Sequence, residues 1–184
     1  MEGLNFMTLM PTALLSPESL ALDFFRQSAG EWKSQRRYYT LKQDIEPEEV
    51  VSMIGIRFLT QGSDELTDLA QAHQLESATA LLGGTEVIWE SNYIGKSRQP
   101  STGKTVFGIL GNILYRDRGF ATDKPVTAIF NFTNPQTMCL RTEYGGSVFT
   151  EELKLIGQQY RTRQTIISRA QEEIMIGQYL EKRL

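Results

Sequence analysis

The stretch that decides the fold lies where helical spacing of apolar residues gives way to strict alternation. It reads Gly30-Glu31-Trp32-Lys33-Ser34-Gln35-Arg36-Arg37-Tyr38-Tyr39-Thr40. Successive side chains of a β-strand point to opposite faces, so every second residue from Trp32 to Thr40 shares one face. The pattern therefore predicts a strand that begins at about Glu31.

One helix is expected directly before this strand. Ser16-Pro17-Glu18 supplies an N-cap, a proline at the first helical position and an early acid. An apolar stripe follows from Leu20 to Phe25, and Gly30 is suited to end the helix. The sequence predicts an N-terminal α-helix near residues 17–28, preceded by a flexible extension over residues 1–15.

Alternation continues along the rest of the chain in segments separated by turn signals. The expected strands cover 31–40, 50–59, 86–93, 104–116, 125–133, 137–144, 147–156, 159–169 and 172–182, with one short helix between 63 and 73. A long antiparallel meander closes into a barrel because closure removes its edges. We predict a mostly β fold: a lipocalin-like or fatty-acid-binding-protein-like antiparallel barrel of about nine to ten strands, in one domain over residues 1–184. Polar groups on both strand faces favour an interior cavity.

Composition limits the function classes. The chain has 184 residues, a formal net charge of -3 and 22% charged residues, which does not favour nucleic acid or anionic membranes as partners. The only cysteine is Cys139 and the only histidine is His73, so an intrachain disulfide and multi-Cys or multi-His metal sites are excluded. No metal and no permanent cofactor is expected. No apolar run approaches the ~20 residues of a membrane span, and a cytosol-like compartment is expected.

Two arginines near the end of the chain suggest a binding site. In the segment Tyr160-Arg161-Thr162-Arg163, strand geometry puts Arg161 and Arg163 on one face. If this face looks into the barrel, its guanidinium groups suit a large, flat, dianionic ligand, because arginine binds carboxylates in bidentate geometry. The alternative is a solvent-exposed strand face.

Several short motifs occur in the order in which a known family carries them. They are Ser28-Ala29-Gly30-Glu31-Trp32-Lys33-Ser34-Gln35-Arg36, Gly83-Gly84-Thr85-Glu86-Val87-Ile88-Trp89-Glu90, Gly103-Lys104-Thr105-Val106, Arg116-Asp117-Arg118-Gly119-Phe120-Ala121, Leu140-Arg141-Thr142-Glu143-Tyr144, Glu151-Glu152 and Arg161-Thr162-Arg163. From about Phe24 to Arg183 the chain resembles the S/U-type phycobiliprotein lyases, the CpcS/CpeS class of bilin chromophore lyases. The family's Ser-Glu-x-Arg ending appears as Leu180-Glu181-Lys182-Arg183.

The resemblance implies a lipocalin-like barrel that binds an open-chain tetrapyrrole, phycocyanobilin or a related bilin, as its substrate. It implies that the protein promotes thioether attachment of this bilin to a cysteine of a phycobiliprotein subunit, of the phycocyanin or allophycocyanin type. The nucleophile is then the acceptor's cysteine and not Cys139. The implied setting is antenna assembly in the cyanobacterial cytosol or plastid stroma, and the sequence allows a homodimer. The alternatives are a bilin carrier or chaperone without transfer activity, and a scaffold that binds subunits but no ligand.

The resemblance also suggests which residues contact the ligand. Arg161 and Arg163 are expected to hold the propionates of the bilin, and Arg36 to supply a third cation. Trp89 offers a flat surface on which pyrrole rings can stack. The alternatives are a core position for Trp89 and an exposed position for Arg36.

Two carboxylates are the predicted catalytic residues. Glu143 and Glu151 can accept hydrogen bonds from pyrrole N–H groups, and a carboxylate stabilises a cationic tetrapyrrole. The alternative is that Glu143 and Glu151 form structural salt bridges with Arg161 or Arg163.

Overall fold

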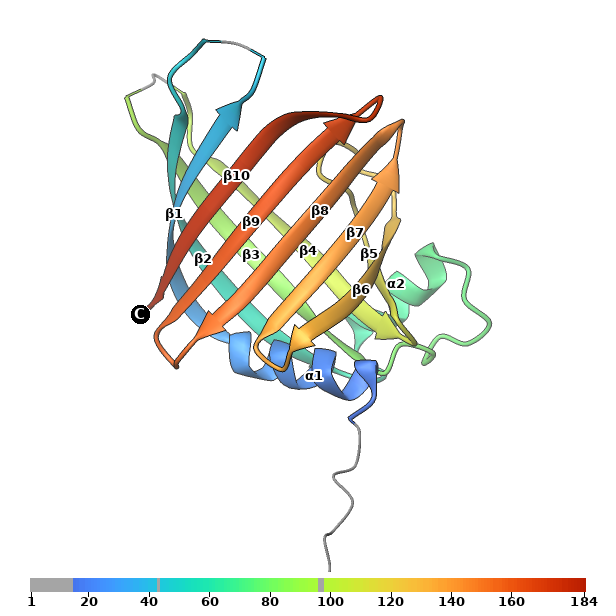
Figure 1. Ribbon diagram of the computed structural model, residues 1–184. Helices are drawn as coiled ribbons and strands as arrows, with labels where there is room; N and C mark the ends of the chain where they lie inside the picture. Colours follow the sequence, from blue (N-terminus) through green and yellow to red (C-terminus); the bar gives the residue numbers. More distant parts are fainter. Residues whose placement is uncertain (1–14, 43, 96–97) are drawn as a thin grey trace, which may run out of the picture.

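The computed structural model describes residues 15–42, 44–95 and 98–184, which form a closed antiparallel barrel (Figure 1). Its strands are β1 (Gly30–Thr40), β2 (Glu48–Thr60), β3 (Gly83–Tyr93), β4 (Ser101–Leu110), β5 (Ile113–Arg116), β6 (Val126–Asn134), β7 (Thr137–Tyr144), β8 (Ser147–Ile156), β9 (Tyr160–Arg169) and β10 (Glu172–Arg183). Each strand pairs with its neighbours in chain order, and β1 closes the barrel by pairing with both β2 and β10. The predicted barrel is confirmed.

One predicted strand is divided in two. The segment expected as a single strand over 104–116 contains β4, a turn and β5. Gly111 occupies the turn with a φ of 61°, a conformation that residues with a side chain rarely adopt. The prediction for residues 1–15 concerns, apart from Leu15, residues outside the described part of the chain.

Helix α1 (Pro17–Ser28) lies across one end of the barrel (Figure 1). It begins as predicted, with the backbone N–H of Ser19 donating to the side chain of Ser16. Phe24 and Phe25 are buried and pack with the apolar residues inside the barrel. Glu18 fixes the start of the helix, because its carboxylate accepts a hydrogen bond of 2.7 Å from the backbone N–H of Gly111.

The other end of α1 is held by an arginine from the last strand. Arg183 donates to the backbone carbonyls of Gln27 (2.6 Å) and Ala29 (2.5 Å). Its guanidinium carbon lies 4.2 Å from the centre of the Trp32 ring, and the indole N–H of Trp32 donates to the carbonyl of Ser28. These bonds use carbonyls that the end of a helix leaves without intrahelical partners. The helix is thereby fixed across the barrel end.

Helix α2 (Asp64–Ala72) packs on the outside of the barrel against β4. It has its own apolar cluster, formed by Leu59, Leu66, Leu69, Ala70, Leu81 and Val106. His73 follows the helix, and its Nε2 lies 2.9 Å from the carbonyl oxygen of Arg116 at the end of β5. The backbone of Arg116 is therefore held from outside.

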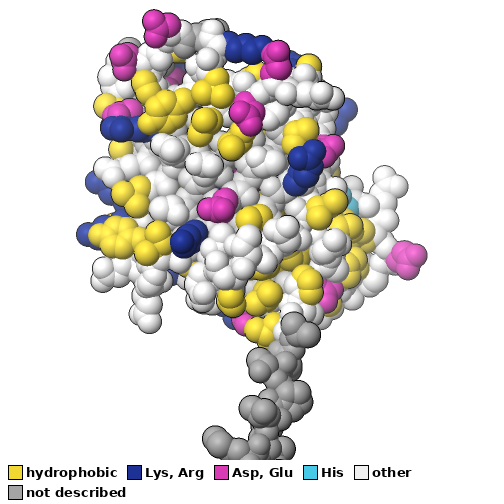
Figure 2. All heavy atoms as spheres, viewed as in Figure 1, with side chains coloured by type: hydrophobic (Ala, Val, Ile, Leu, Met, Phe, Trp, Pro, Cys, Tyr) yellow, Lys and Arg dark blue, Asp and Glu magenta, His cyan; other side chains and the backbone are white. Residues whose placement is uncertain are grey.

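The barrel interior holds both apolar and charged side chains. Next to α1 it is apolar, with Trp32, Ile54 and Phe130 in one cluster. Buried polar and charged side chains also lie inside the barrel, among them Arg116, Glu151, Arg161 and Glu181, whereas the outer face carries scattered charges (Figure 2). No helix in the described part of the chain is long and apolar enough to span a membrane.

Candidate functional site

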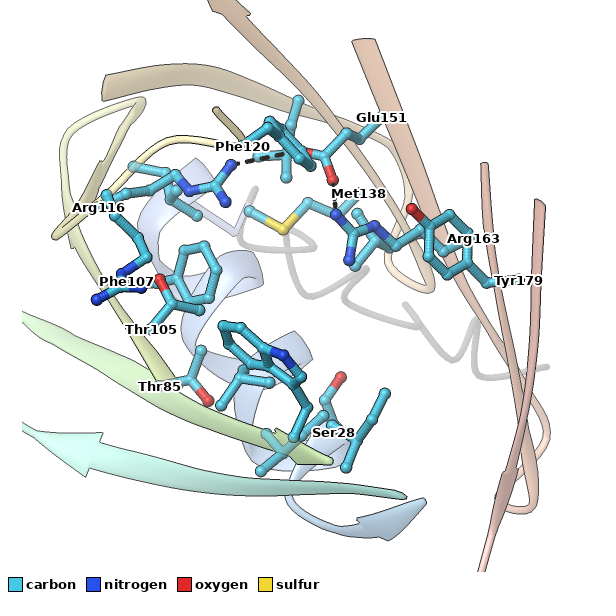
Figure 3. Close-up of a pocket in the computed structure, with 18 of the residues that line it drawn as sticks. Ser28, Thr85, Thr105, Phe107, Arg116, Phe120, Met138, Glu151, Arg163 and Tyr179 are labelled. Atoms are coloured by element: carbon cyan, nitrogen blue, oxygen red, sulfur yellow. Dashed lines mark hydrogen bonds and ion pairs between the residues drawn. The ribbon is translucent and has the colours of Figure 1, made fainter. Parts of the chain in front are cut away.

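A cavity of about 510 Å³ occupies the barrel interior, with α1 forming its floor (Figure 3). Aromatic side chains from the helix, the strands and the 117–125 loop form much of its wall. They are Phe24, Phe25, Tyr38, Trp89, Phe107, Phe120 and Tyr179. The charged residues of the wall are Arg36, Arg116, Arg118, Arg161, Arg163, Asp123, Glu151 and Glu181. Such a mixture of rings and fixed charges is typical of a site for a ligand with apolar and ionic parts.

Arg161 and Arg163, the two arginines at the start of β9, point into the barrel. Arg161 is buried, and its Nε donates to Glu181 on β10 with a distance of 2.5 Å. The hydroxyl of Ser34 donates to the other oxygen of Glu181, and the Nε of Arg36 donates to this hydroxyl. This chain of bonds links β9, β10 and β1 close to α1. The solvent-exposed alternative for Arg161 does not hold.

Glu151 on β8 lies between two arginines. The Nη2 of Arg163 donates to its Oε1, while the Nη1 of Arg116 is 3.6 Å from its Oε2 (Figure 3). Burial lowers the pKa of Arg116. Burial alone would also lower the pKa of Arg163, but Glu151 and other neighbours outweigh it and raise this pKa. Two cations share one carboxylate, so this cluster carries a surplus positive charge.

Tyr179 on β10 is positioned between two cations of the cavity. The guanidinium carbons of Arg163 and Arg36 lie 4.9 and 5.4 Å from the centre of its ring. Burial raises the pKa of Tyr179 to about 12, so its hydroxyl stays protonated at neutral pH.

Trp89 on β3 lines the opposite part of the wall and is half-buried. In the register of β3 and β4 it faces Gly103, where a Cβ atom would overlap the indole ring. The glycine therefore lets the indole lie against the backbone of β4. This explains in physical terms why a glycine precedes Lys104 in one of the sequence motifs.

The 117–125 loop covers part of the cavity wall. Phe120 and Tyr144 both stack on Phe149, each with its ring centre 4.8 Å from that of Phe149. The hydroxyl of Tyr144 accepts a hydrogen bond from the N–H of Ala121. The loop is thus attached to β7 and β8.

The structure corrects the prediction for Glu143. Its side chain is on the outer face of β7, is more than half exposed and accepts a hydrogen bond of 2.6 Å from Arg141. Alternation along β7 turns the neighbouring Thr142 into the barrel instead. Of the two carboxylates predicted to be catalytic, only Glu151 lines the cavity.

Several cavity residues were not predicted. They are Arg116, Phe107, Phe120, Tyr179 and Glu181. Arg116 and Phe120 belong to the Arg-Asp-x-Gly motif, and Glu181 to the motif at the end of the chain, so a signal was present. Their inward direction depends on strand register and barrel closure, which alternation within one strand does not supply.

Cys139 lies on β7 between two residues, Met138 and Leu140, that line the cavity, so its own side chain points outward. Burial, followed by the charge of Glu152, raises the pKa of its thiol. Within the described residues, His, Cys, Asp and Glu side chains form no group of three or more that could hold a metal ion.

A closed antiparallel barrel with a helix across one end and a charged, aromatic cavity defines a lipocalin-like ligand-binding protein. The model of the family described as CpeS-like protein matches residues 21–184, and the chain belongs to this family. The family recognised from the sequence motifs is therefore confirmed.

Named relatives agree with this assignment. The chain is 65% identical over 167 residues to "Putative phycocyanobilin lyase CpcS 2" of Nostoc sp. strain PCC 7120, covering 91% of this chain and 92% of the relative. It is 48% identical to "Putative chromophore lyase CpcV" of Picosynechococcus sp. strain PCC 7002, covering 93% and 85%. The structure of the S-type phycobiliprotein lyase CPES from Guillardia theta superposes with a TM-score of 0.74 at 20% identity, over 88% of this chain and 91% of that chain. This last likeness supports the fold.

Proposed function

We propose that this protein is a bilin lyase, which binds phycocyanobilin or a related open-chain tetrapyrrole and promotes its attachment to a phycobiliprotein cysteine. The observation that carries the proposal is the charge of the cavity in a CpeS-like barrel. Five arginines and three carboxylates line it, which leaves a surplus of two positive charges. A bilin has two propionates, so its charge complements this surplus, while its pyrrole rings suit the aromatic wall.

The ligand contacts follow from this charge distribution. Arg163 and Arg36 are the proposed contacts for propionate oxygens, because both guanidinium groups lie beside Tyr179 in the cavity. Arg161 donates to Glu181 through Nε, and a guanidinium has five N–H donors, so it can still bind a ligand. Trp89 is the proposed stacking surface.

The proposed reaction adds the acceptor's thiol across the ethylidene double bond of ring A. A C–S bond forms at the ethylidene carbon, and the C=C π bond breaks. The thiol loses one proton and a carbon of ring A gains one, so the addition is balanced. The protein contributes by holding the bilin in one conformation and presenting ring A to the acceptor. Glu151 accepts hydrogen bonds from the pyrrole N–H groups and stabilises their positive charge. Cys139 takes no part, since it points away from the cavity.

The partners and the setting also belong to the proposal. The acceptor is a phycobiliprotein subunit of the phycocyanin or allophycocyanin type. Because the relatives of 65% and 48% identity come from the cyanobacteria Nostoc and Picosynechococcus, we place the reaction in antenna assembly in a cyanobacterial cytosol or a plastid stroma.

A transfer assay tests the function. Purified protein is incubated with phycocyanobilin and an apo-phycocyanin subunit, and covalent bilin on the acceptor is measured by zinc-enhanced fluorescence after denaturing electrophoresis. We expect the covalent product to form faster with the protein than without it. Binding of the bilin with an unchanged transfer rate would identify a carrier instead, and a protein that binds no bilin would contradict both functions.

A further inference from the structure

Arg116 is a buried cation whose hydrogen-bonding groups are incompletely used. Only 6% of the residue is exposed, and its one carboxylate neighbour among the described salt bridges, Glu151, lies 3.6 Å away. This distance allows ionic attraction but is too long for a hydrogen bond. The Nε of Arg116 also has no hydrogen-bond partner within the described part of the chain. Buried polar groups normally have partners, because burial without them costs free energy.

Glu151 satisfies Arg116 only in part. Its Oε1 already accepts the hydrogen bond from Arg163, which holds the carboxylate on the β9 side of the cavity. Its Oε2 is buried and has no hydrogen-bond partner among the described residues. The single negative charge is thus shared by two guanidinium groups, and Arg116 is the more weakly bound of the two.

The position of Arg116 is restricted by two aromatic rings and by the anchored residue that follows it. Its guanidinium carbon lies 5.0 Å from the ring centre of Phe107 and 4.6 Å from that of Phe120. The next residue, Asp117, accepts hydrogen bonds from the hydroxyl of Thr105 and the N–H of Val106. A cation held in this way loses little freedom when it binds an anion.

We propose that Arg116 binds one of the two carboxylates of the ligand. The inference rests on the proposed function, and it adds a residue on β5 to the carboxylate contacts on β1 and β9. Figure 3 shows Arg116 and Arg163 on either side of Glu151, so a carboxylate on Arg116 lies on the β5 side of the cavity. The two aromatic rings keep water from Arg116, which strengthens its attraction for a carboxylate.

The test compares phycocyanobilin with its dimethyl ester, in which both carboxylates are neutral. Each ligand is titrated into the wild-type protein and into Arg116→Gln, and binding is followed by the absorption of the bilin. We expect Arg116→Gln to weaken binding of the free acid about tenfold or more and to leave binding of the ester unchanged. Arg141→Gln, which removes a guanidinium from the outer face, is the matched control and should bind both ligands like the wild type.

Three results would overturn the proposal. An equal loss for the acid and the ester would mean that Arg116 only maintains the shape of the cavity. No loss for either ligand would mean that Arg116 contacts no carboxylate. A wild-type protein that binds neither ligand would contradict the proposed function itself, and the wild-type titration separates this failure from the other two. If Arg116→Gln does not fold, Arg116→Lys serves instead: it keeps the charge without the planar fork, and we expect a smaller loss that is again confined to the acid.

Discussion

Two groups of buried arginines in the same barrel differ in how completely their charges are matched. Near α1, Arg161 and Glu181 form a one-to-one pair, and Ser34 adds a hydrogen bond to the carboxylate. Two residues further along β9, Arg163 shares Glu151 with a second arginine from β5. The first group is electrically neutral and the second is not. In this barrel, the unbalanced charge of the second group is the stronger indication of a site for a carboxylate.

The largest expected effect is on the neutral pair. Glu181→Leu leaves Arg161 without its carboxylate in a buried place, and breaking a buried ion pair in this way costs about 3–5 kcal/mol. We expect this loss in the free energy of unfolding, measured by urea denaturation. Glu143→Gln removes an exposed carboxylate and should change stability by less than about 0.5 kcal/mol. A loss of similar size in both variants would contradict the structural role of the pair.

Substitution of Glu151 tests the unbalanced group. Glu151→Gln keeps the shape of the side chain but removes the negative charge that Arg116 and Arg163 share, so the protonated tetrapyrrole loses its counter-ion. We expect bilin transfer at saturating bilin to slow by about 100-fold, while binding of the free acid is not weakened. Glu152→Gln, at the neighbouring position on the outer face, is the control. Equal rates in the two variants would remove Glu151 from the proposed chemistry.

Substitution of Arg163, in the same group, is expected to have a smaller effect, on the affinity for the bilin. Arg163→Ala should weaken binding of phycocyanobilin by about tenfold or more, the value of one charge-assisted hydrogen bond, and Arg163→Lys should restore part of it. Thr162 points to the other face of β9, so Thr162→Ala should bind normally when measured by the same absorption titration. If Thr162→Ala binds weakly and Arg163→Ala binds normally, the ligand lies outside the barrel.

The smallest effect is expected outside both groups. Cys139→Ser changes a side chain on the outer face of β7, and the acceptor subunit supplies the thiol for the reaction. Transfer should continue at the wild-type rate, with stability within about 0.5 kcal/mol of the wild type. Loss of transfer in a folded Cys139→Ser variant would show that the nucleophile had been assigned to the wrong protein.

The sequence predicts features that depend on neighbouring residues and misses features that depend on distant ones. The cap at Ser16 and the alternation after Gly30 are local, and α1 and the barrel follow from them. Glu143 was misplaced because the alternation of β7 does not say which face turns inward. Register with the strands on both sides decides this, as it does for Glu151.

Arg116 was missed for a related reason. Its strand, β5, has only four residues. The prediction of one strand over 104–116 therefore missed the turn at Gly111, where the chain reverses direction. The role of Glu181 as the partner of Arg161 follows only from the pairing of β10 with β9, which places the two residues opposite each other. Both residues nevertheless belong to motifs that support the family assignment. The sequence therefore singled out the two residues, but it did not indicate that their side chains enter the cavity.

The anchoring of α1 by Arg183 has a consequence for synthesis on the ribosome. Arg183 and Ala29, which it holds, are 154 residues apart in the chain, and β1 likewise finds its second partner only in β10. Contacts of such long range form late, because the entropy of closing the loop opposes them. A nascent chain that lacks β10 has an open sheet edge and an unsecured floor. The pigment pocket is therefore completed only after translation of the last strand, and partly synthesised chains offer bilin no finished site.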